Sequence, residues 1–189
     1  MPNLILIRHS QSQPEPGVPA RLWALTEEGR RRCILLAERL APYNLDVIIT
    51  SMEPKAIETG DLVAQRLGIL CRARENLHEQ ARETVPYFGM HKEFQEAVAT
   101  LFSRPVELVF GEEMACEAHA RFAGAIQSGL AEYPQENIAV VSHGTVLSLF
   151  ASRYAGQETF AFWQVVGLPA YMVFDVPEMK LRAQANEII

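Results

Sequence analysis

The sequence predicts an α/β fold, a three-layer sandwich in which helices cover both faces of a mostly parallel sheet. Short apolar runs rich in β-branched residues alternate with amphipathic helical segments along the 189 residues, as in chains built from βαβ units. Three of these runs, at residues 4–7, 46–51 and 138–144, have basic, hydroxyl or histidine side chains at or directly after their carboxyl ends. Open α/β sheets bind their ligands at the carboxyl ends of the strands, so we expect a functional site there.

Length and composition favour a single domain over residues 1–189, without linkers or internal repeats. The net charge of -6 argues against a broad surface for nucleic acid or anionic membrane, because those partners require clustered Lys and Arg. Cys33, Cys71 and Cys116 are widely spaced, which suits free thiols in a reducing compartment. Because we find no leader sequence and no apolar run of about 20 residues, we predict a cytoplasmic protein.

The first half of the chain predicts two pairs of strand and helix, followed by a third strand over residues 69–73. Thr26 is a good N-cap for the first helix, and Pro42 ends that helix. Pro54 suits the first turn of the second helix, and Gly68 suits its end.

The second half predicts four more helices, the late strand and a terminal hairpin. Apolar side chains recur at helical spacing in the first two of these helices. These helices are expected over residues 92–102, 114–131, 145–154 and 159–165. Two β-type runs at 170–176 and 181–185, separated by a turn that contains proline, are expected to close one edge of the sheet.

Basic and histidine residues gather at the predicted strand ends. Arg8 and His9 follow the first strand, and His143 follows the late strand. Lys55 lies in the first turn of the helix after the second strand. Such a set suits a tetrahedral dianion, because charged donors bind its oxygens, and a histidine can also act as a nucleophile. Each residue alone fits a surface turn or a structural role better, but the combination favours phosphoryl transfer.

These motifs resemble those of the histidine phosphatase superfamily, branch 1, also called the phosphoglycerate mutase-like family. The family's Arg-His-Gly motif corresponds to residues 8–10, and its Leu-Thr-x-x-Gly helix start to residues 25–29. Its Ser-Ser-Pro-Leu-x-Arg-Ala-x-x-Thr-Ala segment aligns without gaps on residues 50–60. Its Leu-x-Glu element lies at 77–79 and its Ser-His-Gly motif at 142–144. The motifs occur in the family's order over nearly the whole chain, so the resemblance implies a phosphoglycerate mutase-like fold.

The resemblance also implies a mechanism. His9 is expected to attack phosphorus and form a phosphohistidine. Glu79 is expected to protonate the leaving oxygen and then to activate water, with Glu75 as the alternative acid, and His143 is expected to assist catalysis. The residues expected around the phosphate are Arg8, Lys55, His143 and Ser12. The resemblance implies no metal and no organic cofactor, and the expected partner is a small phosphorylated substrate.

Three positions depart from the family's motifs. Lys55 stands in the place of an arginine and therefore lacks the planar fork that binds two oxygens together. Ser10 replaces a glycine, which adds a Cβ where the backbone could need to approach phosphate or adopt a positive φ. The asparagine that the family often has a few residues later is replaced by Pro14 and Glu15. We expect reduced affinity or an altered substrate range rather than loss of activity.

Other phosphate and metal motifs fit the sequence less well. Cys33 and Arg39 have the Cys-x5-Arg spacing of another phosphatase class, but they lie in mid-helix with no glycine between them. His78 and Glu79 begin like a His-Glu-x-x-His zinc motif, but the closing position is Arg82. We therefore predict no metal site.

The sequence thus favours a phosphatase that hydrolyses phosphate monoesters through His9. Phosphoglycerate mutase-type phosphoryl transfer is an alternative, although the segment between Glu79 and Met114 offers limited material to cover an intermediate. A second alternative is a phosphate-binding or interaction module with weak or no turnover. The loops at 11–23 and 80–92 are expected to form the mouth of the pocket.

Overall fold

A six-stranded sheet forms the centre of the fold, with strand order β3-β2-β4-β1-β5-β6. The computed structural model describes residues 2–85 and 91–189. The strands are β1 (Asn3–Arg8), β2 (Val47–Thr50), β3 (Leu70–Ala73), β4 (Ile138–Ser142), β5 (Ala170–Asp175) and β6 (Lys180–Ala185). β1 to β4 run parallel, whereas β5 and β6 form the predicted antiparallel hairpin at one edge. The prediction of a mostly parallel sheet is confirmed.

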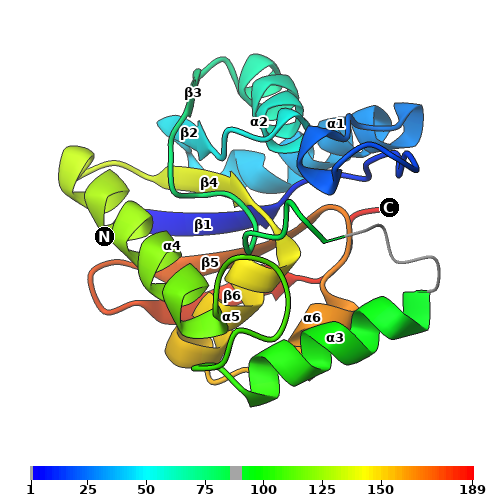
Figure 1. The fold of residues 1–189 in the computed structure, drawn as a ribbon. Coiled ribbons are helices and arrows are strands. Elements are labelled where there is room, and N and C mark those ends of the chain that lie inside the picture. The colour runs from blue at the N-terminus through cyan, green and yellow to red at the C-terminus, as the bar shows by residue number, and fades with distance from the viewer. Residues whose placement is uncertain (1, 86–90) are drawn as a thin grey trace.

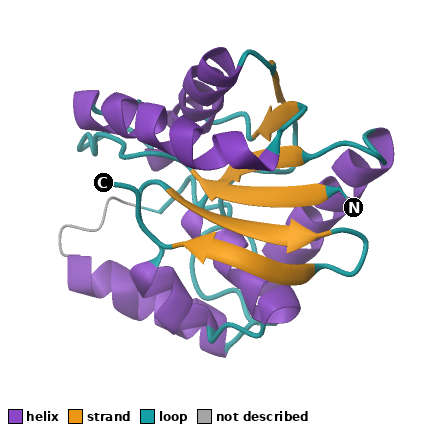
Figure 2. Cartoon of the chain, turned by 180° about the vertical axis from the view of Figure 1, so that it is seen from behind, coloured by secondary structure: helices purple, strands orange, loops and turns teal. Residues whose placement is uncertain are grey.

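Helices cover both faces of this sheet, which confirms the predicted three-layer sandwich. α1 and α2 pack on one face and α4 and α5 on the other, while α3 packs on α6 and α6 packs on α5. The helices are α1 (Glu27–Leu40), α2 (Pro54–Leu67), α3 (His91–Ser103), α4 (Ala115–Glu132), α5 (Gly144–Ala155) and α6 (Thr159–Val165). α4 and α5 lie in front of the sheet in Figure 1 and behind it in the reversed view of Figure 2.

Two short 3-10 turns complete the described elements. One of them, η1 (Ala20–Leu22), lies inside the segment that the sequence predicted as a loop, and the other, η2 (Ala41–Tyr43), follows α1. Among the described residues, no helix combines the length and the apolar character that a membrane span needs.

The central strands supply both hydrophobic cores. Along β1, Leu4 and Leu6 join the core under α4 and α5, whereas Ile5 and Ile7 join the core under α1 and α2. All four side chains are fully buried. Successive side chains of a strand point to opposite faces, so a continuous apolar run is what a strand covered on both sides requires.

The pairing register brings the ends of three strands together. In the parallel ladder Arg8 lies opposite Ser142, and the backbone N–H of His9 donates to the Ser142 carbonyl at 2.9 Å. On the other side of β4, the N–H of Ser51 donates to the Val141 carbonyl at 3.0 Å. The residues that follow β1, β4 and β2 therefore emerge at one edge of the sheet.

The start of α1 lies against the chain that follows β1. Thr26 caps this helix as predicted, since its hydroxyl oxygen accepts the Gly29 N–H at 2.8 Å. Gly29 lacks a side chain where one could not fit, because a Cβ at this position would lie 2.2 Å from the Gln11 carbonyl oxygen. The absence of a side chain at Gly29 therefore lets α1 approach the loop that follows β1.

We expect Gly29→Ala to lower the free energy of unfolding by about 1–3 kcal/mol, because the added methyl group must displace the Gln11 backbone. The measurement is urea denaturation followed by circular dichroism. Gly124→Ala is the matched control, since Gly124 lies exposed within α4 with open space around it and should gain about 0.5–1 kcal/mol from better helix propensity. Equal effects of the two substitutions would contradict the proposed close approach.

Candidate active site

His9 and His143 face each other at the edge where β1 and β4 end. Their ring centroids lie 5.2 Å apart, and the two residues are only 6% and 1% exposed. The Arg8 guanidinium lies against Gly144, the first residue of α5. A Cβ added to Gly144 would lie 3.1 Å from Cζ of Arg8. The structure therefore brings together three of the residues that the sequence placed at the site.

The hydrogen bonding of His9 defines its tautomer. Its Nδ1 lies 2.7 Å from the Ser10 carbonyl oxygen, which can only accept, so Nδ1 carries the proton and Nε2 keeps its lone pair. Burial lowers the pKa of His9 well below its ordinary value, and electrostatic interaction with His143, Lys55 and Arg8 lowers it further. His9 is thus a neutral imidazole at pH 7, the form that acts as a nucleophile.

His143 is held by the hydroxyl group of Ser51. Its Nε2 lies 2.6 Å from Ser51 Oγ, whereas its Nδ1 is buried without a hydrogen-bond partner. Burial lowers the pKa of His143 well below its ordinary value, with Lys55 adding to the effect and Glu79 opposing it. His143 is thus a neutral imidazole at pH 7, with Nε2 bonded to Ser51 and Nδ1 without a protein partner.

Lys55 is buried in an ion pair that the sequence analysis missed. Its Nζ lies 2.5 Å from Oε2 of Glu53 and donates to the Ala20 carbonyl oxygen at 2.7 Å. The other carboxylate oxygen of Glu53 accepts the Glu79 N–H at 3.0 Å and lies 3.4 Å from Nε2 of His143. In the sequence, the only indication of a role for Glu53 was its position at the start of a predicted helix, two residues before Lys55.

Glu79 uses its carboxylate to cap α5. Its oxygens accept the N–H groups of Thr145 at 3.0 Å and Val146 at 3.3 Å, which are free donors at the helix start. Burial alone would raise the pKa of Glu79, but Arg82, His143 and backbone N–H groups together bring it below its ordinary value. This carboxylate is therefore ionised at pH 7 and lies beside His143.

Arg82 is a second residue that the sequence analysis missed as part of the site. One of its terminal nitrogens lies 3.9 Å from Oε2 of Glu79, and its guanidinium lies 4.9 Å from the centre of the Phe94 ring. Its other terminal nitrogen, Nη1, is buried without a partner. In the sequence, the only indication of a role for Arg82 was that a basic residue follows Glu79 by three positions.

Arg8 likewise keeps an unused donor. Its Nη1 donates to the Val166 carbonyl oxygen, and its Nε is buried without a partner. Burial lowers the pKa of Arg8 to about 10, against the attraction of Glu79, so the group stays charged at pH 7. Arg8 and Arg82 thus each have a buried N–H donor without a partner, and buried donors of this kind suit an oxyanion.

Ser10 fits its position without strain. Its φ is not positive, its hydroxyl donates to the Gly29 carbonyl at 2.7 Å, and its N–H donates to Oγ1 of Thr59 at 2.9 Å. Its side chain therefore holds the loop against α1, and its backbone N–H holds the loop against α2.

Two expected residues are not joined to this network by the contacts described. Ser12 is half-buried and pairs through its backbone with Leu25. Glu75, the alternative acid, is exposed to solvent. Part of the expected mouth, residues 86–90, lies outside the described residues.

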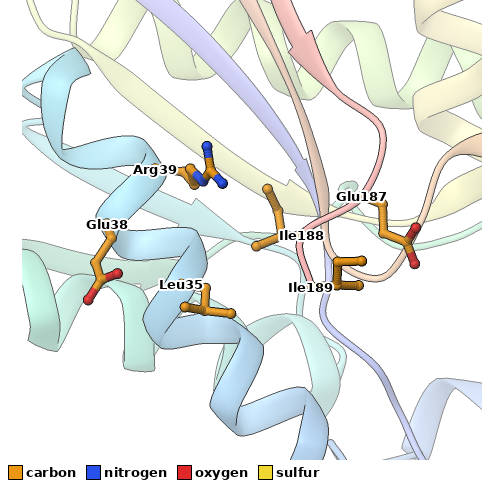
Figure 3. A pocket seen from close by; sticks show the side chains of 6 residues that line it. All are labelled: Leu35, Glu38, Arg39, Glu187, Ile188 and Ile189. Carbon is orange, nitrogen blue, oxygen red and sulfur yellow. The ribbon is translucent and has the colours of Figure 1, made fainter.

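No other described cluster competes as a centre of chemistry. Within residues 2–85 and 91–189, no three His, Cys, Asp or Glu side chains are grouped as metal ligands. Cys33, Cys71 and Cys116 are free thiols, as predicted, and burial raises the pKa of Cys33 to about 11. A surface pocket of about 360 Å³, drawn in Figure 3, has none of the candidate active-site residues in its lining. It is lined by Leu35, Glu38, Arg39, Glu187, Ile188 and Ile189.

Comparisons with known proteins point to one family. The model of the histidine phosphatase superfamily (branch 1) matches residues 4–178. Bacillus stearothermophilus YhfR is 22% identical with a TM-score of 0.74, over 97% of this chain and 95% of that one. The alpha-ribazole phosphatase from Shigella flexneri is 22% identical with a TM-score of 0.71, over 99% and 98% of the two chains.

A third similar structure is a mutant phosphoserine phosphatase from Entamoeba histolytica in complex with phosphoserine. It is 15% identical with a TM-score of 0.75, and the match covers 100% of both chains. At these identities the structures establish the phosphoglycerate mutase-like fold that the sequence predicted. No curated protein matches the sequence.

The buried neutral state of His9 predicts a pH dependence of stability. Below pH 6.5 the unfolded chain protonates this histidine while the folded chain does not, so the free energy of unfolding falls as the pH is lowered. We expect His9→Asn, which keeps a donor near the Ser10 carbonyl but cannot titrate, to reduce this slope by up to about 1.4 kcal/mol per pH unit. Urea denaturation between pH 5 and pH 7 measures it, and identical slopes for the two proteins would contradict the buried neutral state.

Proposed function

The chain belongs to branch 1 of the histidine phosphatase superfamily, and on that premise we propose that it is a phosphatase of small phosphate monoesters. One domain, residues 1–189, carries the activity, and His9 forms a phosphohistidine intermediate. The observation that carries this proposal is the state of His9, a buried neutral imidazole whose Nδ1 is anchored and whose Nε2 has a free lone pair.

In the first step Nε2 of His9 attacks phosphorus, the new P–N bond forms, and the P–O bond to the leaving group breaks. Arg8, Lys55 and His143 hold the phosphoryl oxygens, since each is a cation or a donor beside His9. Ser12, which the resemblance places at the phosphate, lies in the loop after β1 and pairs through its backbone with Leu25. Charged donors aimed at oxygens on which charge builds up provide the largest part of such catalysis.

Glu79 transfers the protons of the reaction. It is ionised in the empty site, but a phosphoryl dianion beside it raises its pKa, so that it takes up a proton when substrate binds. It then gives this proton to the leaving oxygen and, as a carboxylate again, accepts a proton from water. That water attacks phosphorus, the P–N bond breaks, and phosphate and neutral His9 are released.

The similar structures favour hydrolysis over phosphoryl transfer between hydroxyls, because those with named activities above are a phosphoserine phosphatase and an alpha-ribazole phosphatase. The short distance in sequence from Glu79 to α4 supports the same choice. This segment offers only limited material for a cover over the phosphorylated intermediate.

We expect His9→Ala to reduce phosphate release from a chromogenic phosphate ester by a factor of about 10³ or more, because the nucleophile is lost. The circular dichroism spectrum should remain that of the wild type. Wild-type protein given radiolabelled substrate and quenched in alkali should carry an acid-labile label, which His9→Ala should lack. Equal rates of release from the two proteins would rule out the proposed function.

Two carboxylates were candidates for the acid, and a matched pair of substitutions separates them. We expect Glu79→Gln to lower kcat for a poor leaving group by about 10²–10⁴, the usual contribution of a positioned acid. Glu75→Gln, an exposed carboxylate in the same segment, should leave kcat within about twofold of the wild type. A loss confined to Glu75→Gln would reverse the assignment.

A further inference from the structure

We propose that Glu53 is a built-in counter-ion of the phosphate pocket, a positioning residue that fixes Lys55 and limits the affinity of the site for the phosphoryl dianion. This inference rests on the proposed function, because it assumes that phosphate binds between Arg8, Lys55 and His143. It assigns a role to a residue that stands where the family's motif has a leucine, two positions before the basic residue.

One carboxylate contacts three residues of the proposed machinery. Oε2 lies 2.5 Å from Nζ of Lys55, and the two side chains are only 9% and 7% exposed. Oε1 accepts the backbone N–H of Glu79 at 3.0 Å and lies 3.4 Å from Nε2 of His143. Glu53 is therefore in direct contact with the proposed machinery, and its charge is poorly screened by solvent.

The local structure of α2 does not account for this orientation. Glu53 is the N-cap residue of α2, a position where a carboxylate normally accepts N–H groups of its own helix. Its side chain makes no such hydrogen bond. The carboxylate turns instead toward Lys55, so its contacts are with the site rather than with the helix it begins.

Lys55 keeps one donor for substrate while it is paired. An ammonium group has three N–H donors, of which one faces Glu53 and one faces the Ala20 carbonyl. The flexible lysine side chain is thus held in one position, and its third N–H remains for a phosphoryl oxygen. This geometry compensates in part for the missing planar fork of an arginine.

The same pair lowers the positive charge that phosphate meets. Arg8, Lys55 and Arg82 are the cations whose charges act on the two histidines, and Glu79 and Glu53 are the carboxylates beside them. A fixed negative charge next to Lys55 repels a dianion that binds to Lys55. Glu53 should therefore weaken the binding of product phosphate and speed its release.

Binding of sulfate tests this inference directly, because sulfate is a tetrahedral dianion whose charge is constant near neutral pH and whose binding needs no turnover. In isothermal titration calorimetry at low ionic strength, Glu53→Gln should bind sulfate and inorganic phosphate about tenfold more tightly than the wild type. In steady-state kinetics the same variant should show a lower KM, stronger inhibition by phosphate and a lower kcat. Damage to the fold would weaken binding and cannot produce this gain.

A matched variant locates the effect. Glu58→Gln removes another paired carboxylate of α2, one that binds Arg30 at 2.5 Å at the protein surface, and should leave sulfate affinity unchanged.

Unchanged or weaker sulfate binding by Glu53→Gln would overturn the inference, and so would an equal gain in Glu58→Gln. These outcomes are separate from failure of the proposed function. If the wild type releases phosphate from esters but Glu53→Gln gains no affinity, only the counter-ion role fails. If Glu53→Gln binds sulfate more tightly but the wild type hydrolyses no ester, the counter-ion role holds and the phosphatase assignment fails.

Discussion

The register of the parallel ladder between β1 and β4 determines where the reactive groups lie. Both faces of β1 are apolar, so the alternation of its side chains does not by itself exclude a slipped pairing. Polar groups at the two ends supply the missing constraint. The Asn3 N–H donates to Oδ1 of Asn137 at 2.9 Å, and the His9 N–H donates to the Ser142 carbonyl at 2.9 Å. A slip in either direction would pull Asn3 or Arg8 into the apolar core, which is costly.

Given this register, the site must hold several ionisable groups where water is largely excluded. The histidines avoid the cost of burial by remaining neutral, as the lowered pKa values of His9 and His143 indicate. The fixed charges are compensated one by one. Lys55 faces Glu53, Glu79 receives backbone N–H groups and faces Arg82, and Arg8 donates to a carbonyl. This local balance is what a buried polar site requires in order to stay folded without a ligand.

Periodicity and cap residues predicted the helices and strands because those signals are local. Thr26, Pro54 and Gly68 mark the helix ends as expected, and the buried runs of β1 and β4 lie at the centre of the sheet. Glu53 and Arg82 could not be predicted in the same way, since a charged residue in a polar segment is usually solvated. Their roles depend on contacts made across the fold, with Lys55 and His143 in one case and with Glu79 and Phe94 in the other.

In the proposed reaction His9 must be neutral to attack phosphorus, and Glu79 must carry a proton to donate to the leaving oxygen. Before substrate binds, His9 is neutral as required, but Glu79 is ionised. Binding of the substrate changes the protonation state of Glu79. A dianion raises the pKa of every group around it, yet the effect differs with each group's partners. Glu79 gains a proton to donate and His143 becomes a better donor, while the proton on Nδ1 of His9, shared with the Ser10 carbonyl, keeps Nε2 directed at phosphorus. Departure of phosphate reverses these changes, so a counter-ion that limits phosphate affinity also returns the site to its reactive protonation state.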